Sequence, residues 1–405
     1  MIYAVDFVKK TKIREFGDLS RKLEKEGKKI VKAYIGTPKY KDTRIFNILN
    51  LALEYYVSGR ISSNIDDSFL YDRFEQAKCL IDLCKKETNP HFYSDFRGME
   101  NIRKVIGEIE GRDYKEAFIT NGAMEGLFIT LVTLASQKNV LLPEISFHPY
   151  YKYMALLASA KPYKYSTIDE AIEKIETEKY STIVIASPNN PDGTVASETE
   201  LKRLVDTAAS HNTWVIVDRV YKNLALVGNV PAPPRAENVI ETYSISKDVG
   251  FPGIRGGVVL GTKEAIEKIA IVALPIRASV NNLTQIVLGV SYQNLDLVKN
   301  RRNELIDKLN GLIRSLSQNI EYTQPKGGLY LWLRVNKDGY NFALDLLHKK
   351  QIAVAPGCEF NFDSPSNYPY IRVTFGALTA EQTSIVGEAI SDIYEQAEQE
   401  QRSKS

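Results

Sequence analysis

The chain has 405 residues, of which 44% are hydrophobic, so it can bury a substantial core and form two or three domains or one large domain with a smaller one. Its 52 Lys and Arg residues nearly balance its 50 Asp and Glu residues, which argues against nucleic acid or an anionic membrane as a partner and favours small molecules. The three cysteines and four histidines fit neither a disulfide framework nor a metal-ligand cluster, and no stretch approaches the roughly 18 apolar residues of a membrane span, so we expect a cytosolic protein without a metal site.

The predicted elements begin with an N-terminal segment, residues 1–50, which we expect to join a small domain formed by the end of the chain. Residues 58–67 are polar, and a helical pattern follows through Lys86. From about residue 96 to residue 270, short β-branched apolar runs alternate with amphipathic helical patterns. This alternation is typical of an α/β domain, in which helices cover both faces of a sheet.

The alternating region contains six predicted strands and four predicted helices. The helices are expected at 123–136, 150–158, 168–178 and 198–211. The strands are expected at Ala117–Thr120, Val140–Pro143, Ser181–Ala186, Thr213–Asp218, Val239–Ser244 and Gly256–Gly261.

A long helical pattern over 282–316 is expected to carry the chain out of this large domain. Beyond it the pattern predicts a strand at Gly328–Val335, a helix at 341–350, a strand at Tyr370–Phe375 and a helix at 379–397. These elements indicate a small α+β domain. The predicted division is therefore 1–50, joining the small domain, 51–300, the large domain, and 301–405, the small domain.

Polar residues follow the predicted strands, and ligands of open α/β sheets bind beyond the carboxyl ends of strands. The run TNGAM, with Gly122 and Ala123, leads from a strand into a helix whose free N–H groups suit a phosphate, although a helix cap without a ligand would look the same. The run SPNNPDGT follows the strand ending at Ala186. Its prolines form a rigid turn that either aims Asn190 as a hydrogen-bond donor or is only a turn.

The other two strand ends carry an acid and an amine. Asp218 ends the run WVIVD, where it could pair with a protonated ring nitrogen or serve as a helix cap. Lys247 lies in the run YSISKDVGFPGIRGG, and its amine could form a Schiff base with an aldehyde or be an ordinary surface amine. Nearby Ser244, Ser246 and Arg255 offer hydroxyls and a guanidinium that fit the oxygens of a phosphate monoester.

The four strand ends together supply a phosphate cradle, an amide donor, an acid and a nucleophilic amine. A site for pyridoxal 5′-phosphate needs this complement of groups. We therefore predict that the chain binds this cofactor.

The order and spacing of these residues resemble the fold type I pyridoxal-phosphate enzymes of the aminotransferase class I/II family, from Gly36 to the last helix. The resemblance implies a mainly parallel, seven-stranded type of sheet and a homodimer with shared active sites. It implies that Lys247 carries the cofactor as an aldimine and then moves protons, while Asp218 pairs with the pyridine nitrogen. It also assigns Asn190 and Tyr221 to the ring oxygen, Gly122, Ala123, Ser244, Ser246 and Arg255 to the phosphate, Phe147 to ring stacking, Tyr93 to a neighbouring subunit's phosphate, and Arg372, Gly36 and Asn190 to the substrate.

The sequence departs from the family pattern in several places. Asp192 replaces the usual threonine of the Asn-Pro-Thr-Gly turn, and Arg219 replaces the usual acid after the ring-binding aspartate. Residues 58–90 read as an insertion beside the substrate entrance, where they would form either a lid or a solvent-exposed addition. No arginine stands where aspartate-type enzymes hold a second carboxylate, although Arg277 is nearby, so a dicarboxylic amino donor is not indicated.

The residues leave three functions open. The first is an aminotransferase that moves an amino group between an L-α-amino acid and a 2-oxo acid. The second is another reaction on the same cofactor, such as elimination, cyclisation or an oxygen-using deamination of a modified amino acid. The third is a binding or regulatory protein without catalysis, which the complete residue set and the short segment before Gly36 disfavour. Fold resemblance does not identify the substrate side chain.

Overall fold

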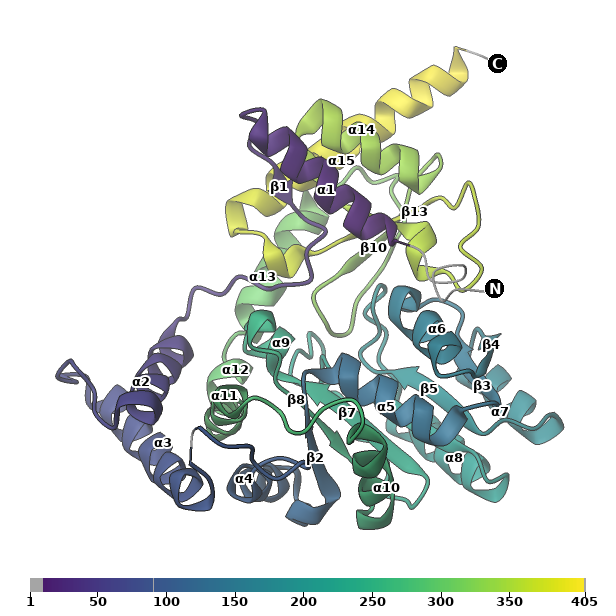
Figure 1. The fold of residues 1–405 in the computed structure, drawn as a ribbon. Helices are drawn as coiled ribbons and strands as arrows, with labels where there is room; N and C mark the ends of the chain where they lie inside the picture. Colours follow the sequence, from purple (N-terminus) through teal and green to yellow (C-terminus); the bar gives the residue numbers. More distant parts are fainter. Residues whose placement is uncertain (1–9, 90, 404–405) are drawn as a thin grey trace.

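The computed structural model describes residues 10–89 and 91–403, and its large sheet lies between two layers of helices (Figure 1). The strand order is β2-β8-β7-β6-β5-β3-β4, and only β8 runs antiparallel to its neighbours. The predicted mainly parallel α/β sheet of seven strands is therefore confirmed. The strands are β2 (Ala117–Thr120), β3 (Asn139–Pro143), β4 (Lys161–Tyr165), β5 (Thr182–Ala186), β6 (Trp214–Asp218), β7 (Val239–Ser244) and β8 (Gly257–Leu260).

Strand β4 is absent from the sequence prediction. Its sequence KPYKY carries two lysines, and as the edge strand it buries few of its residues. An edge strand exposes one side to water, so it lacks the apolar run by which the inner strands were recognised.

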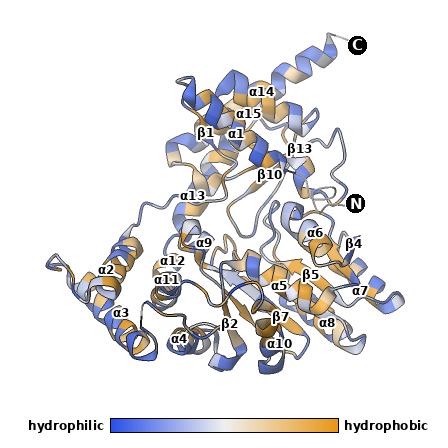
Figure 2. Cartoon of the chain, in the orientation of Figure 1, coloured by the Kyte–Doolittle hydropathy of each residue, from blue (hydrophilic) through white to orange (hydrophobic). Residues whose placement is uncertain are grey.

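Alternating side chains of the inner strands build separate cores on the two faces of the sheet. Val184 and Ile216 pack on one face, while Ile183, Ile185 and Val217 pack on the other. Figure 2 shows the apolar strands between helices whose outer surfaces are hydrophilic. The helices around the sheet are α4 (Glu100–Glu110), α5 (Ala123–Ala135), α6 (His148–Leu157), α7 (Ile168–Thr177), α8 (Glu198–Ser210) and α10 (Lys263–Ala273).

The predicted long helix over 282–316 is wrong in one respect, because the structure divides it into α11 (Asn282–Gln293), α12 (Leu295–Lys299) and α13 (Arg302–Arg314). The first break is at Asn294, whose side chain donates to the Val290 carbonyl oxygen at 2.8 Å. An asparagine that bonds the backbone in this way competes with the helical pattern. The apolar periodicity continues across the breaks, which is why the sequence reads as one helix.

The second, four-stranded sheet has the order β12-β13-β10-β9, and helices α14 and α15 pack beside it (Figure 1). The N-terminal segment lies against these elements, since β1 pairs in parallel with β11. The division of the chain at residues 50 and 300 stays a prediction. The elements are α1 (Lys12–Lys25), β1 (Val31–Lys32), β9 (Tyr322–Thr323), β10 (Leu331–Arg334), α14 (Gly339–Lys350), β11 (Ile352–Ala353), β12 (Ala355–Pro356), β13 (Tyr370–Val373) and α15 (Ala380–Arg402).

Helices α2 (Arg44–Ser58) and α3 (Ser68–Glu87) form a separate arm that packs on α4 and α11 (Figure 1). Their apolar stripes account for the packing, with Ile48, Ala52, Ala77 and Ile81 all buried. Among the described helices, none is both long and apolar enough to cross a membrane.

Candidate active site

The strand ends that carry the predicted polar residues meet at one edge of the large sheet. Asp218 lies opposite Ala186 on β5 and Thr242 on β7, and Gly257 lies opposite both Ser244 and Thr120. A cavity of about 740 Å³ opens at this edge, between the large sheet and the small-domain elements. Its walls include Gly36, Ala123, Phe147, Asn190, Asp218, Tyr221, Ser244, Ser246, Lys247, Arg255 and Arg372, all of which were predicted from the sequence, together with Ile13, Arg14, Gly17, Arg21, Tyr34, Met124, Tyr150, Tyr151 and Tyr330.

Lys247 projects into the cavity from α9 (Ile245–Asp248), a single helical turn that follows β7 directly. Its Nζ donates to the Gly36 carbonyl oxygen at 2.6 Å. A Cβ at position 36 would lie 2.7 Å from the Tyr330 hydroxyl and 3.0 Å from Lys247 Nζ, so a larger residue there would displace these two side chains. The hydroxyl of Tyr40 donates to the Lys247 carbonyl oxygen at 3.2 Å, which further ties the Gly36 segment to α9.

One end of the cavity forms an anion cradle. Gly122 precedes α5 with φ of 79° and no side chain caps this helix, so the first N–H groups of α5 remain available to a ligand. The guanidinium of Arg255 lies beside Gly122, where an added Cβ would come within 2.5 Å of its Nη2. The hydroxyls of Ser244 and Ser246, 2.8 Å apart, complete a donor set that suits a phosphate.

Asp218 lies at the floor of the cavity and is an isolated carboxyl group. It accepts hydrogen bonds from the Tyr151 hydroxyl at 2.6 Å and from the Val220 N–H at 3.0 Å. Burial raises the pKa of Asp218, and these bonds and the Lys247 ammonium oppose the rise only in part. A buried carboxyl in this state favours a cationic ligand group, because such a group would stabilise its ionised form.

Arg372, on β13, lines the same cavity and is buried. Its Nη1 donates to Asn190 Oδ1 at 2.9 Å and its Nη2 donates to the Tyr34 carbonyl oxygen at 2.7 Å, while its Nε has no partner among the described residues. Burial lowers the pKa of Arg372. The Asn190 amide nitrogen is left as the donor, as the sequence predicted, and the Tyr221 hydroxyl lies 2.8 Å from that of Tyr330.

Phe147, Tyr150 and Phe360 form an aromatic wall. The Phe147 ring stacks on Phe360 with centroids 5.9 Å apart and meets Tyr150 edge-on at 4.4 Å. Phe360 in turn lies under the Arg372 guanidinium, with 4.7 Å between Cζ and the ring centroid. The wall therefore connects the Phe147 segment of the large sheet with Arg372 on β13.

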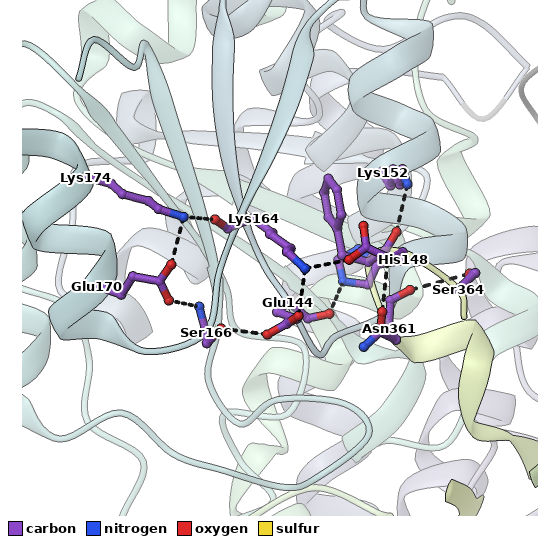
Figure 3. Close-up of polar contacts among 11 residues, drawn as sticks. Glu144, His148, Lys152, Lys164, Ser166, Glu170, Lys174, Asn361 and Ser364 are labelled. Atoms are coloured by element: carbon purple, nitrogen blue, oxygen red, sulfur yellow. Dashed lines mark hydrogen bonds and ion pairs between the residues drawn. The ribbon is translucent and has the colours of Figure 1, made fainter. Parts of the chain in front are cut away.

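A polar clasp, formed by Glu144, Lys152, Lys164, Phe362 and Asp363, holds this wall in place (Figure 3). Lys164 bridges Glu144 at 2.9 Å and Asp363 at 2.5 Å, and Lys152 donates to the Phe362 carbonyl oxygen at 2.7 Å. The Phe362 N–H also donates to the Glu144 carbonyl oxygen at 2.8 Å. The clasp therefore fixes the loop after Phe360 on the large domain.

Two departures in the sequence have structural explanations. Arg219 points away from the cavity and pairs with Glu241 on β7, which also binds Arg112 at 2.5 Å. Asp192 accepts from the Thr194 N–H and hydroxyl and from Asn189, so it shapes the turn that presents Asn190. Neither residue lines the cavity.

Three other sequence-derived residues or segments lie elsewhere. Tyr93 is 81% exposed and outside the cavity of its own chain. The guanidinium of Arg277 donates hydrogen bonds to Glu125 and to the carbonyl oxygens of Phe96 and Ile119. No described residue of the 58–90 segment lines the cavity, and the predicted position of this segment beside the substrate entrance, as a lid or as an exposed addition, stays a prediction.

The family follows from a comparison of the whole sequence. The sequence model for aminotransferases of class I and II matches residues 73–390. The chain belongs to the aminotransferase class I and II family. It is a transferase that depends on pyridoxal 5′-phosphate.

Two relatives agree with this assignment, and a solved structure shares the fold. This aminotransferase is 27% identical over 288 residues to the aspartate aminotransferase of Thermococcus kodakarensis, covering 70% of this chain and 76% of the relative. It is 25% identical over 370 residues to the (5-formylfuran-3-yl)methyl phosphate transaminase of Methanocaldococcus jannaschii, covering 88% and 90%. Its fold matches an archaeal alanine:glyoxylate aminotransferase with a TM-score of 0.79 at 20% identity, covering 98% of each chain.

The cofactor fits the residues of this cavity. The anion cradle offers a guanidinium, two hydroxyls and uncapped N–H groups, and the glycine at position 122 lets the guanidinium of Arg255 lie close to the start of α5. The buried Asp218 carboxyl lacks a cationic group beyond Lys247. Both features match the charges of a pyridoxal phosphate ring, whose phosphate is anionic and whose protonated nitrogen is cationic.

Proposed function

We propose that this aminotransferase moves an amino group between an L-α-amino acid and a 2-oxo acid, with Lys247 as the residue that bonds the cofactor's aldehyde carbon and then moves the substrate proton. The observation that carries the proposal is the placement of Lys247 Nζ in one cavity with an anion cradle, a buried carboxyl and a buried arginine. These groups match the cofactor's phosphate, the cofactor's ring nitrogen and the substrate carboxylate in turn.

The bound cofactor supplies an electron sink that makes the α-proton of an attached amino acid acidic. Lys247, once displaced by the substrate amine, is free to take that proton from Cα and return it on the cofactor side. Asp218 in its ionised form holds the ring nitrogen protonated. Arg372 binds the α-carboxylate and thereby orients the Cα–H bond.

The remaining residues hold the cofactor. Gly122, Ala123, Ser244, Ser246 and Arg255 surround its phosphate, and Phe147 covers its ring. The amide of Asn190 and the hydroxyl of Tyr221 donate to its ring oxygen, the latter supported by Tyr330. Gly36 lies on the substrate side, and its carbonyl oxygen accepts a hydrogen bond from the free amine of Lys247.

A half-reaction assay tests this function against elimination, cyclisation or oxidation. The holoenzyme is mixed with single amino acids, and the cofactor spectrum and products are followed with and without a 2-oxo acid. We expect a stoichiometric conversion of the cofactor to its amino form without the oxo acid, and turnover only with it. Continued release of ammonia or peroxide without an oxo acid would contradict transamination.

Tyr151 is expected to tune Asp218. In Tyr151→Phe, the buried carboxylate loses the bond from the hydroxyl, so the pKa of Asp218 rises further above its ordinary value. Because the ionised form is the active one, the acid limb of the kcat/KM profile should move to higher pH, and activity should fall about tenfold. The matched control is Tyr165→Phe, which removes a buried hydroxyl that donates to the Val184 carbonyl oxygen outside the cavity. An unchanged profile in Tyr151→Phe would refute this role.

We also propose that the enzyme is a homodimer in which Tyr93 contacts the partner's cofactor phosphate. Tyr93 and Phe92 are 81% and 70% exposed, and Asn282 Nδ2 anchors the loop through the Phe92 carbonyl oxygen at 2.9 Å. An exposed tyrosine in an anchored loop can contact a neighbouring molecule.

Sedimentation should give twice the chain mass of 45.7 kDa. Tyr93→Phe should leave the dimer intact and weaken cofactor binding about tenfold, through loss of one charge-assisted hydrogen bond. Tyr71→Phe, another exposed tyrosine, should not change cofactor binding. A monomeric holoenzyme with full activity would disprove the shared site.

A further inference from the structure

Helix α1 brings two arginines to the cavity. Ile13, Arg14, Gly17 and Arg21 all line it, and their spacing places them on one side of the helix. The sequence of α1 is rich in charged residues, as is typical of a surface helix, and so it does not by itself indicate a site. The packing of α1 beside β12 and β11 is what turns this side toward the site.

Gly17 allows α1 to lie close to the substrate side of the cavity. A Cβ at position 17 would be 3.3 Å from the Tyr34 hydroxyl and 3.7 Å from Arg21 Nη1. The carbonyl oxygen of the same Tyr34 accepts from Arg372 Nη2. Tyr34 therefore lies between Arg372 and the side of α1 that carries Arg14 and Arg21.

The cationic side chains that line the cavity differ in whether they already have a hydrogen-bond or ion-pair partner. Lys247 donates to Gly36, Arg255 to the carbonyls of Pro252 and Asn121, and Arg372 to Asn190 and Tyr34. Arg21 is paired with Asp18. Arg14 differs, because its guanidinium has no hydrogen-bond or ion-pair partner in the described part of the chain.

The charges of cofactor and substrate use up the other cations. In the proposed function the phosphate would bind at Arg255 and the α-carboxylate at Arg372. Asp218, the only carboxylate among the described residues that line the cavity, would pair with the ring nitrogen. An unpaired guanidinium that lines the cavity and is exposed to solvent attracts a further anion. No substrate group has yet been assigned to Arg14.

We propose that Arg14, with Arg21 beside it, binds an anionic group at the far end of the substrate side chain, so that the amino donor is an acidic amino acid with a carboxylate or phosphate in that position. This inference rests on the proposed transamination. The sequence did not indicate a dicarboxylic amino donor. Arg277 is bound to Glu125 and to two carbonyl oxygens, and in this proposal the cation comes instead from α1.

The experiment measures half-reaction rates of the holoenzyme with matched pairs of L-amino acids. The carboxylate pairs are aspartate with asparagine, glutamate with glutamine, and 2-aminoadipate with norleucine, and the phosphate pair is O-phosphoserine with serine. In at least one pair, we expect the acidic member to react more efficiently than its neutral match. The pair that responds identifies the carboxylate or the phosphate as the group and sets the length of the side chain.

Arg14→Gln should then lower the acidic-to-neutral preference about tenfold, as expected for loss of one charge-assisted hydrogen bond at a partly exposed position. Lys22→Gln removes the same charge from α1 at a residue that does not line the cavity, and it should keep the preference of the wild type. A wild type that prefers the neutral member of every pair, or an Arg14→Gln variant with an unchanged preference, would overturn the inference and leave transamination standing. Failure of every amino acid to convert the cofactor would instead overturn the proposed function.

Discussion

Lys247→Ala is expected to reduce transamination by about 10⁴-fold or more, because the variant loses both the covalent attachment of the cofactor and the group that moves the α-proton. Its Nζ lies among the cavity residues, and within the described part of the chain its hydrogen-bond partner is the Gly36 carbonyl oxygen. The cavity itself should persist, since the aliphatic stem of one lysine contributes little to the core. The variant should therefore still bind the cofactor noncovalently through the anion cradle.

Borohydride trapping separates the loss of the bond from the loss of folding. Reduction of the wild type should leave the cofactor mass on the peptide that contains residue 247, and the variant should carry none. Lys202→Ala, which removes an exposed lysine on α8, is the control and should label and react as the wild type does. Trapped cofactor on the Lys247→Ala protein would mean that another amine forms the bond.

Glu241→Gln is expected to destabilise the fold by about 3–5 kcal/mol. The change leaves the buried guanidinium of Arg219 without its counter-charge, and it leaves that of Arg112 with the more distant Glu116, at 3.9 Å. Glu241 on β7 pairs with Arg112 and with Arg219, and the side chains of all three are at most 10% exposed. Glutamine has nearly the same shape as glutamate, so the loss of stability reports the contribution of the charge. Urea unfolding of the cofactor-free protein gives the difference in free energy of unfolding.

A surface pair provides the control for this loss. Glu264→Gln removes the same charge from an exposed pair with Lys268 on α10, and no measurable change in stability is expected. An equal response of the two variants would show that burial does not matter here. A Glu241→Gln protein as stable as the wild type would contradict the assignment of Arg219 as a structural residue.

The same cluster predicts acid sensitivity. Burial opposes the ionisation of Glu241, but Arg219 and Arg112 outweigh it and lower the pKa of this carboxyl below its ordinary value of 4.5. A lowered native pKa contributes stability above the unfolded pKa, and this stability is lost as the pH falls through the native one. The wild type should therefore lose more stability than Glu241→Gln when the pH falls from neutral to below 4.5.

Much of the large domain could be predicted because its signals are local. Buried parallel strands need short apolar runs, and the helices between them need an apolar stripe, so both periodicities appear in the sequence. The ends of β5, β6 and β7 must then meet, because parallel strands present their carboxyl ends at one edge. Asp218, Asn190 and Lys247 were found in this way. The sequence did not predict the edge strand β4, because this strand has no apolar run. It did not predict the breaks on either side of α12, because the apolar pattern continues across them.

The sequence by itself determined the cofactor class, the sheet and the residues that follow its strands, because each of these depends on short-range spacing. Only the tertiary structure decided that Tyr151 reaches Asp218, that Tyr330 reaches Tyr221, and that Arg14 faces the cavity. These side chains come from helices and from the second sheet, and their direction depends on how those elements pack. Packing is a sum of many weak contacts between distant segments, so no short run of residues encodes it.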